Sequence, residues 1–392
     1  MTLTRLSVAF IPLTDAAPLI AAEEMGFARE EGLKLDLVRA PSWSSLRDML
    51  AFGRVEAAHM LAPVPVAMAL GIGGVASPIS ALSVMSVNGT VIGVSIALAS
   101  KLKAGGHDFD FNDAASAGKA LAAAADTPLR IGVPFPFSMH AELLYYWLDA
   151  SGLPAPQGLS IRTVPPPLMA EALSAGEIDA FCVGEPWGSK AVEAGVGALL
   201  LPGRAIWSFA PEKVLAIRTP WADEEPELTG RLMRAVWKAG RWLSEGGEKT
   251  TAAELLSRQS YLDLATEIID RGLTGRFLIN HRGDMREDPQ FMTFHEGSAN
   301  FPWKSQAAWI ASQIAARLGL DRTAAMDAAR AVFRTDHYRR HLSGSEAILP
   351  GASEKVEGGI AAGTAVAAEN GRLILAENRF FDGRVFDPSP EN

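Results

Sequence analysis

Hydrophobic and polar positions in the first half of the chain follow one order twice: a short apolar run, a proline and then an amphipathic pattern. Leu6–Phe10 and Leu129–Val133 have the length and composition of buried strands. Each is followed by a helical pattern, Asp15–Met25 and Ser138–Ala150, with Asp15 and Ser138 as the expected N-caps. Both units therefore open as a strand, a turn and a capped helix.

The rest of each unit continues this order at a nearly constant spacing. The further expected elements are the strands Leu33–Val38, Val55–Met60, Leu159–Val164 and Ile178–Val183 and the helices Ser44–Phe52 and Leu168–Ala175. Pro12 and Pro136 are 124 residues apart, as are Pro41 and Pro165. Two successive strand–helix–strand–helix–strand units predict an α/β fold with two parallel-sheet lobes. A ligand cleft is expected between the lobes, where two helix N-termini favour an anion.

After about Pro211 the pattern becomes long and helical. The expected helices are Pro226–Glu245, Lys249–Arg258, Leu262–Arg271, Ser305–Leu318 and Arg322–Phe333. A Gly- and Ala-rich tail begins at Gly351 and ends in the apolar stretch Phe380–Phe386, which we expect to dock on the body of the protein or on a partner.

Composition narrows the class of protein. Of the 392 residues, 48% are hydrophobic and 21% charged, which supports a sizeable core and excludes bulk disorder. A net charge of -9 argues against a broad nucleic-acid or anionic-membrane surface, but not against one small bound anion. The segment 60–100 has no Asp, Glu, Lys or Arg, yet its prolines and glycines divide it into pieces too short to span a bilayer. We interpret it as buried strands and a short helix, without membrane insertion.

The single cysteine, Cys182, excludes an intramolecular disulfide framework and a multi-cysteine metal site. A reducing compartment fits this usage, and Pro12 and Asp15 interrupt any secretory leader pattern. The expected location is the cytoplasm, or the periplasm if a leader was removed.

No standard catalytic motif is present: there is no phosphate-binding Walker loop, nucleophile elbow or His-Glu-x-x-His sequence. His337 and His341 have metal-ligand spacing, but the neighbouring Arg339 and Arg340 disfavour a bound cation. We therefore expect no enzyme activity, no metal and no cofactor.

Four positions are candidates for ligand contact, each with an ordinary alternative. Trp43 precedes a helical pattern and either walls a cleft or lies in the core. His140, in the first turn of a helix, opposes the helix dipole if protonated but suits donation to a bound anion. Lys213, at the expected return from the second lobe to the first, is either a cleft ammonium or a surface lysine. The stretch 88–90, Asn-Gly-Thr, offers N–H groups and a hydroxyl, or is an ordinary turn.

These positions lie in motifs that resemble the nitrate- and bicarbonate-binding proteins of cyanobacterial ABC importers. The matching stretches are 14–20 (Thr-Asp-Ala-Ala-Pro-Leu-Ile), 42–43 (Ser-Trp), 87–89 (Val-Asn-Gly), 164–167 (Val-Pro-Pro-Pro), 181–187 (Phe-Cys-Val-Gly-Glu-Pro-Trp) and 211–213 (Pro-Glu-Lys). The similarity runs from about Leu6 to Phe333. It implies a non-catalytic, two-lobed, type II periplasmic-binding-protein-like fold with a helical C-terminal half. Lobe I would be residues 1–92 plus 213–392, and lobe II residues 93–212.

The resemblance also implies a ligand site. The residues that would line an anion pocket are Trp43, Gly89, Thr90, Val91, His140 and Lys213, with Asp15, Pro167 and Glu185 as weaker candidates. Nitrate binders of this family have a lysine matching Lys213, whereas bicarbonate relatives have an acidic residue there and use calcium. Lys213 thus favours nitrate or nitrite and disfavours calcium. Thr90 departs from the family, because nitrate importers carry glutamine at that position.

Among its relatives, the chain looks most like the soluble NasS-type nitrate and nitrite sensors. On this hypothesis it is a cytoplasmic sensor that holds a NasT-type antiterminator with an ANTAR domain and releases it when the ligand binds. The alternative is the solute-binding component of a nitrate or bicarbonate ABC importer, with a permease as partner. A pyrimidine-synthase-like enzyme is a weaker alternative, since such enzymes have a cysteine-rich motif and this chain has one cysteine.

Overall fold

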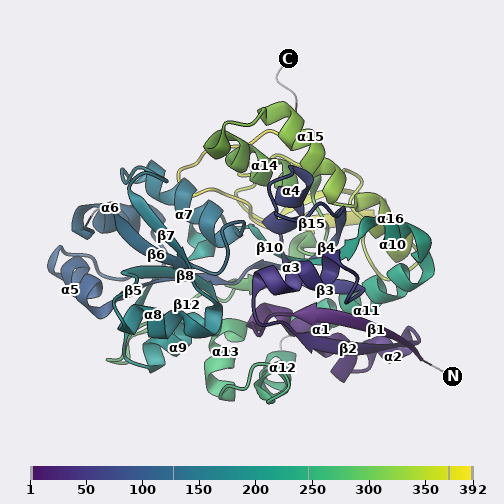
Figure 1. The fold of residues 1–392 in the computed structure, drawn as a ribbon, viewed down its shortest axis with the longest axis horizontal. Coiled ribbons are helices and arrows are strands. Elements are labelled where there is room, and N and C mark those ends of the chain that lie inside the picture. Colours follow the sequence, from purple (N-terminus) through teal and green to yellow (C-terminus); the bar gives the residue numbers. More distant parts are fainter. Residues whose placement is uncertain (1–2, 127, 246, 370, 390–392) are drawn as a thin grey trace.

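The structure is a computed structural model that describes residues 3–126, 128–245, 247–369 and 371–389. Across these residues the strands form two large sheets and two hairpins (Figure 1). Sheet I has the order β13-β4-β10-β3-β1-β2, with β1 Thr4–Phe10, β2 Leu33–Arg39, β3 Ala57–Leu61, β4 Ile79–Asn88, β10 Pro211–Arg218 and β13 Met292–Thr293. Sheet II has the order β7-β6-β8-β5-β9, with β5 Thr90–Ser95, β6 Leu129–Val133, β7 Leu159–Thr163, β8 Ala180–Gly184 and β9 Gly197–Pro202. The hairpins are β11 Arg276–Leu278 with β12 Met285–Glu287, and β14 Thr364–Ala368 with β15 Gly371–Leu375.

Both large sheets are mixed, which corrects the expectation of purely parallel sheets. In sheet I, β1 runs parallel to β2 and β3, but β10 is antiparallel to both β3 and β4. In sheet II, β6 runs parallel to β7 and β8, but β5 is antiparallel to both β8 and β9. β5 and β10 are the strands that follow a crossover between the sheets. Each enters its sheet from the side at which the parallel strands end, and so runs the other way.

The α/β alternation and the sequence repeat are confirmed, with small shifts at element ends. The helices of the first half are α1 Ala17–Glu24, α2 Phe27–Glu30, α3 Trp43–Ala51, α4 Pro63–Ala69, α5 Ile96–Ala104, α6 Ala114–Ala124, α7 Met139–Ala150, α8 Met169–Ser174 and α9 Trp187–Glu193. Ser138 caps α7 as expected, because its side chain accepts a hydrogen bond from the Ala141 N–H. The prediction that Asp15 is an N-cap is wrong. It lies inside a short 3-10 turn, η1 (Thr14–Ala16), and its carboxylate faces the cleft.

The strands and the short helix in the segment without charged residues are buried, as expected from its composition. The segment contains α4, β4 and β5 (Figure 1), and the loop 70–78 between α4 and β4 is exposed or half-buried except at Gly73. Within the described part of the chain, no helix is both long and apolar enough to cross a bilayer.

The helices of the second half pack mainly onto sheet I. They are α10 Thr219–Glu224, α11 Pro226–Ser244, α12 Glu248–Ser257, α13 Thr266–Thr274, α14 Lys304–Leu318, α15 Arg322–Val332 and α16 Thr335–Leu342. Their apolar faces supply buried side chains such as Leu232, Trp309 and Val332 to the common core. α11 lies along α1, and α14 covers α4, so these helices brace the layer that carries Asp15 (Figure 1).

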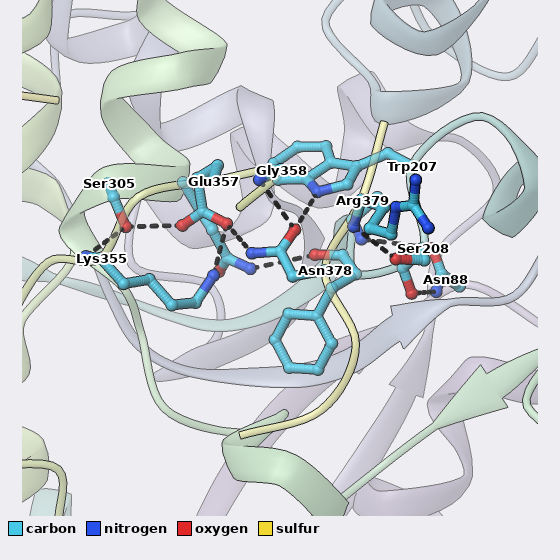
Figure 2. Close-up of polar contacts among 12 residues, drawn as sticks. Asn88, Trp207, Ser208, Ser305, Lys355, Glu357, Gly358, Asn378 and Arg379 are labelled. Carbon is cyan, nitrogen blue, oxygen red and sulfur yellow. Dashed lines mark hydrogen bonds and ion pairs between the residues drawn. The ribbon is translucent and has the colours of Figure 1, made fainter. Parts of the chain in front are cut away.

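The C-terminal tail is tied to both crossovers between the sheets (Figure 2). The Asn378 amide oxygen accepts from the Trp207 indole N–H at 2.7 Å, and the Arg379 N–H donates to the Ser208 hydroxyl at 2.7 Å. The Ser208 carbonyl in turn accepts from the Asn88 amide at 2.8 Å. Trp207 and Ser208 lie between β9 and β10, and Asn88 is the last residue of β4, directly before the crossover to β5. The tail therefore docks on the body of the protein.

The aromatic residues at the end of the tail pack within the molecule. Phe380 packs against Trp207 and stacks on Trp309, and Tyr146 donates a hydrogen bond to Asp382 at 2.8 Å. Phe380 and Phe386 are buried. The aromatic residues of this stretch thus pack on the body of the protein, while Val385 is exposed.

Candidate functional site

Lys213 is the centre of a fully buried polar cluster between the two sheets. It lies on β10, where it pairs with Leu61 of β3 and Ser86 of β4, and its side chain has no exposed surface. The ammonium donates to Asp15 Oδ2 at 2.7 Å and to Glu212 Oε1 at 2.8 Å. Its nitrogen also lies 5.5 Å from the centroid of the Trp43 ring. Lys213 is thus a cleft residue rather than a surface lysine, but its charge is already paired.

The two carboxylates beside Lys213 differ in their ionisation. Burial opposes the charged form of Asp15, but the Lys213 charge and a contact with His59 outweigh it and lower the Asp15 pKa to about 2. For Glu212, burial outweighs the attraction of Lys213 and raises the pKa to about 7. Burial also works against the charge of Lys213, yet the two carboxylates raise its pKa. The cluster is therefore built around a firm Asp15–Lys213 ion pair, with Glu212 close to its titration point at neutral pH.

Two buried histidines flank this ion pair. His59 Nε2 is 3.0 Å from Asp15 Oδ1, and His140 Nδ1 is 3.2 Å from Glu212 Oε1. Burial lowers the pKa of His59 despite the pull of Asp15, and burial together with the Lys213 charge holds the pKa of His140 well below its usual range. Both imidazoles are accordingly neutral near pH 7 and can each supply one N–H.

Many polar atoms around the cluster are buried and have no hydrogen-bond partner among the described residues. They are Thr14 Oγ1, Trp43 Nε1, His59 Nδ1, Ser86 Oγ, Thr90 Oγ1, both ring nitrogens of His140 and Glu212 Oε2. Lys213 uses two of its three N–H donors on Asp15 and Glu212, which leaves one. A buried donor without an acceptor costs about 1–3 kcal/mol, so such atoms in one place require a reason. A small acceptor-rich ligand would satisfy the donors among them.

The crossover loop lies beside the cluster and is held in an unusual backbone conformation. Asn88 has φ 60° and Gly89 has φ 99°, and a Cβ atom on Gly89 would lie 2.7 Å from Met292 Cε. Thr90 pairs with Gly184 and lies beside the buried Cys182, whose thiol pKa is raised by burial and by the Glu212 charge. Val91 is also buried, but its side chain fills the space above Gly188 of α9.

Contacts between the sheets close the cluster off from solvent. The Thr14 N–H donates to the Glu185 carbonyl at 2.8 Å, and the Trp187 indole N–H donates to the Pro12 carbonyl at 2.8 Å. These two bonds join the loop after β1 to the turn after β8. Asp15, Trp43, His140 and Lys213 are each at most 2% exposed. The cluster is therefore closed to solvent in this structure.

The weaker candidates have separate positions. Glu185 is buried at the start of α9, where its carboxylate is 3.2 Å from the Ser189 N–H. Burial raises its pKa to about 7 against that interaction. Pro167 lies on an exposed part of the 3-10 turn η2 (Pro166–Leu168), outside the buried cluster. The structure thus brings together Asp15, Trp43, Thr90, His140 and Lys213, and places Val91, Glu185 and Pro167 beside or beyond them.

Sequence reasoning missed several members of the cluster. His59 is one of them. It is a histidine within the buried strand β3, and because an apolar core does not require a polar residue there, it could have indicated a site. Ser86 is another, since it is a small polar residue within the long apolar β4. Glu212 was passed over in favour of its neighbour Lys213. No group of three or more His, Cys, Asp or Glu side chains placed to hold a metal occurs in the described ranges.

Comparison with known proteins adds to this geometry. The profile of the NMT1-like family matches residues 2–257. The nitrate/nitrite binding protein NrtA from Nostoc sp. is 31% identical over 319 residues, covering 79% of this chain and 70% of that protein. The nitrate import ATP-binding protein NrtC from Synechocystis sp. is 33% identical over 312 residues, covering 79% of this chain. The chain spans 45% of the length of NrtC.

A solved structure matches nearly the whole chain. The periplasmic nitrate-binding protein NrtA from Synechocystis PCC 6803 superposes with a TM-score of 0.84 at 28% sequence identity. The match covers 98% of this chain and 96% of that one. The periplasmic-binding-protein fold expected from the sequence is confirmed, and these relatives are binding or transport proteins rather than enzymes of small-molecule synthesis.

Proposed function

Since this chain belongs to the NMT1-like family, in the group of NrtA-like proteins, we propose that it binds nitrate or nitrite in the Lys213 cluster. The observation that carries the proposal is the set of buried donors without acceptors around an ammonium that has one N–H to spare. Nitrate and nitrite are small monovalent acceptors with no protons to donate. The similar NrtA proteins are named for binding nitrate and nitrite.

The energetics favour such a ligand if water is excluded. Micromolar affinity corresponds to about -8 kcal/mol, and a charge-assisted hydrogen bond contributes on the order of 1.5–3 kcal/mol. Lys213, His140 and Trp43 together with the Thr90 hydroxyl reach that range when the bonds from Thr14 to Glu185 and from Trp187 to Pro12 keep the sheets closed. Binding and closure would then be coupled. We propose that the two sheets move as lobes about the crossovers near 88–90 and 203–210.

A thermal-unfolding screen of the full chain with nitrate, nitrite, bicarbonate, sulfate and cyanate tests the proposal. A ligand at 100 times its dissociation constant stabilises the folded state by about 2.7 kcal/mol. We expect nitrate or nitrite to raise the melting temperature and bicarbonate to have little effect, with or without calcium. A chain that responds to none of these anions would contradict the proposal.

Two biological roles use the same site. We propose a cytoplasmic sensor that holds an ANTAR-domain antiterminator in its ligand-free form, in keeping with the resemblance to NasS-type sensors. The second candidate is the solute-binding component of an ABC importer, which the names of the NrtA and NrtC relatives favour. Co-purification with a purified antiterminator, with and without nitrate, separates them. Nitrate-sensitive binding supports the sensor, and its absence supports the importer.

A further inference from the structure

Glu212 and His140 lie in contact, but the pair has too few protons to form hydrogen bonds both with each other and with a bound anion. His140 Nδ1 lies 3.2 Å from Glu212 Oε1, the oxygen that also accepts from Lys213. Despite this approach, both ring nitrogens of His140 and Glu212 Oε2 are buried and have no hydrogen-bond partner among the described residues. These atoms belong to the same cluster as Trp43 and Thr90, so they are positioned to meet the same ligand.

A neutral imidazole has one N–H, and this limits what His140 can do. If Nδ1–H donates to Glu212, then Nε2 is a bare acceptor and repels an anion. If Nε2–H donates to an anion, then Nδ1 and the Glu212 carboxylate face each other at 3.2 Å as two acceptors with no proton between them. His140 can serve both partners only when the pair holds one more proton. That proton sits either on the imidazole, giving two N–H groups, or on Glu212, giving an O–H towards Nδ1.

The net charge of the cluster also indicates that one more proton is needed when an anion binds. Among the groups that face Glu212, Lys213 is positive and Asp15 negative, while His140 and the Cys182 thiol are neutral and His59 is neutral beside Asp15. With Glu212 ionised, the buried cluster has a net charge of about -1, and a monovalent anion would make it about -2. Burying uncompensated charge is costly, and the described residues offer no second cation in contact with the cluster.

We propose that the Glu212–His140 pair takes up one proton from solvent when the site binds its anion, so that the anion and a proton enter together. This inference rests on the proposed anion-binding function and names Glu212 as a further residue of the site. The proton binds to Glu212 or His140, no covalent bond of the anion changes, and the charge of the cluster stays the same on binding. Glu212 has a pKa of about 7 in the ligand-free protein, so the uptake is greatest above neutrality.

Calorimetry of nitrate binding in buffers of different ionisation enthalpy counts the protons directly. At pH 8 we expect an uptake of about one proton per nitrate, and at pH 6 a smaller uptake because the pair is already partly protonated. The dissociation constant should rise about tenfold per pH unit above pH 7.5. Nitrate binding with no uptake at pH 8, or with proton release, would overturn the inference. A chain that binds neither nitrate nor nitrite would contradict the proposed function itself.

A variant and a control test whether the proton is taken up by the Glu212–His140 pair. Glu212→Gln has an N–H that can donate to His140 Nδ1 and so imitates the protonated pair. It should bind nitrate with no proton uptake and with an affinity that changes less than threefold between pH 6 and 8.5. Asp288→Asn is the control, because burial also raises the pKa of that carboxyl, which pairs with Arg204 away from the cluster. It should retain the uptake of the unmodified chain. A Glu212→Gln protein that still takes up one proton would place it elsewhere and overturn the inference.

Discussion

Two buried clusters in this molecule each contain a lysine and a glutamate, and they differ in how completely their polar atoms are paired. In the tail cluster, Glu357 accepts from Ser305, Asn378 and Lys355, and Asn378 accepts from Trp207 (Figure 2). Each of these side-chain atoms has a hydrogen-bond partner. In the Lys213 cluster, a comparable set of residues leaves indole, hydroxyl and imidazole atoms unpaired. The polar atoms of the tail cluster are therefore paired within the protein, whereas those of the Lys213 cluster need a ligand to be paired.

The largest expected effect is on nitrate affinity, and it should distinguish Lys213 from Lys355. Lys213→Met should weaken nitrate binding at least 100-fold, about 2.7 kcal/mol, because it removes the central charge and the spare N–H donor. Lys355→Met, in the tail cluster, should leave the affinity within threefold of its original value. Calorimetry on both variants checks the pair. Methionine is preferred to glutamate at position 213, since glutamate would bury a third carboxylate beside Asp15 and Glu212.

If Lys355→Met abolished nitrate binding and Lys213→Met did not, the assignment of the two clusters would be reversed.

Removing Asn378 should cost folding stability rather than affinity. Asn378→Ala leaves the Trp207 indole N–H without its acceptor, removes one of the two hydrogen bonds to Glu357 Oε2 and frees the Gly358 N–H. We expect the free energy of unfolding to fall by about 2 kcal/mol, measured by urea denaturation. The nitrate dissociation constant serves as the control and should change less than threefold. A loss of stability below about 0.5 kcal/mol would show that the tail cluster is not a structural brace.

Glu185 provides an intermediate case, a buried carboxylate with an N–H neighbour in Ser189. Its pKa is raised from 4.5 to about 7, so the ionised form is disfavoured in the folded state. The cost is absent below pH 4.5 and fully present above pH 7. Glu185→Gln retains an acceptor and has no such cost. Its stability relative to the original chain should therefore increase by about 2 kcal/mol between pH 5 and 8, as measured by urea unfolding at each pH.

A comparison of the two proteins at each pH is needed because the buried histidines contribute their own pH dependence, which cancels in the difference. A difference that stays constant with pH would contradict the raised pKa of Glu185.

The smallest expected effect concerns one hydroxyl group in the binding cluster. Thr90→Val retains the shape of the side chain and removes an unpaired buried hydroxyl. If that hydroxyl donates to the anion, nitrate affinity should fall about fivefold, close to 1 kcal/mol, with little change in stability. A Ser305→Ala variant in the tail cluster should show the opposite pattern, with lower stability and the same affinity. Unchanged nitrate affinity in Thr90→Val would remove Thr90 from the site.

The repeat in the sequence predicted much of this fold, because the periodicity of apolar residues reports local structure. The runs Leu6–Phe10 and Leu129–Val133 are strands, and Ser138 caps its helix. The antiparallel direction of β5 and β10 was not predictable in this way, since it depends on how the chain crosses between sheets. The local pattern of a strand is the same in either direction.

For the candidate site, the sequence indicated residue types but not their pairing. Trp43, His140 and Lys213 do converge, yet Lys213 meets two carboxylates that come from η1 and from its own strand neighbour. Asp15 is 198 residues away along the chain, and no local pattern predicts that contact. The exposure of Pro167 likewise depends on the turn around it, because its neighbour Pro166 is buried.

The placement of β10 between β3 and β4 has a consequence for the order in which the protein is made. Residues 90–202, which contain all of sheet II, lie between β4 and β10 along the chain. Sheet I therefore cannot be completed during synthesis until the whole of sheet II has left the ribosome. Folding of the inserted segment brings Gly89 and Pro211 close together and shortens the loop that β10 must close, which reduces its entropic cost. The cleft is thus assembled late, by a strand that returns to a sheet begun more than a hundred residues earlier.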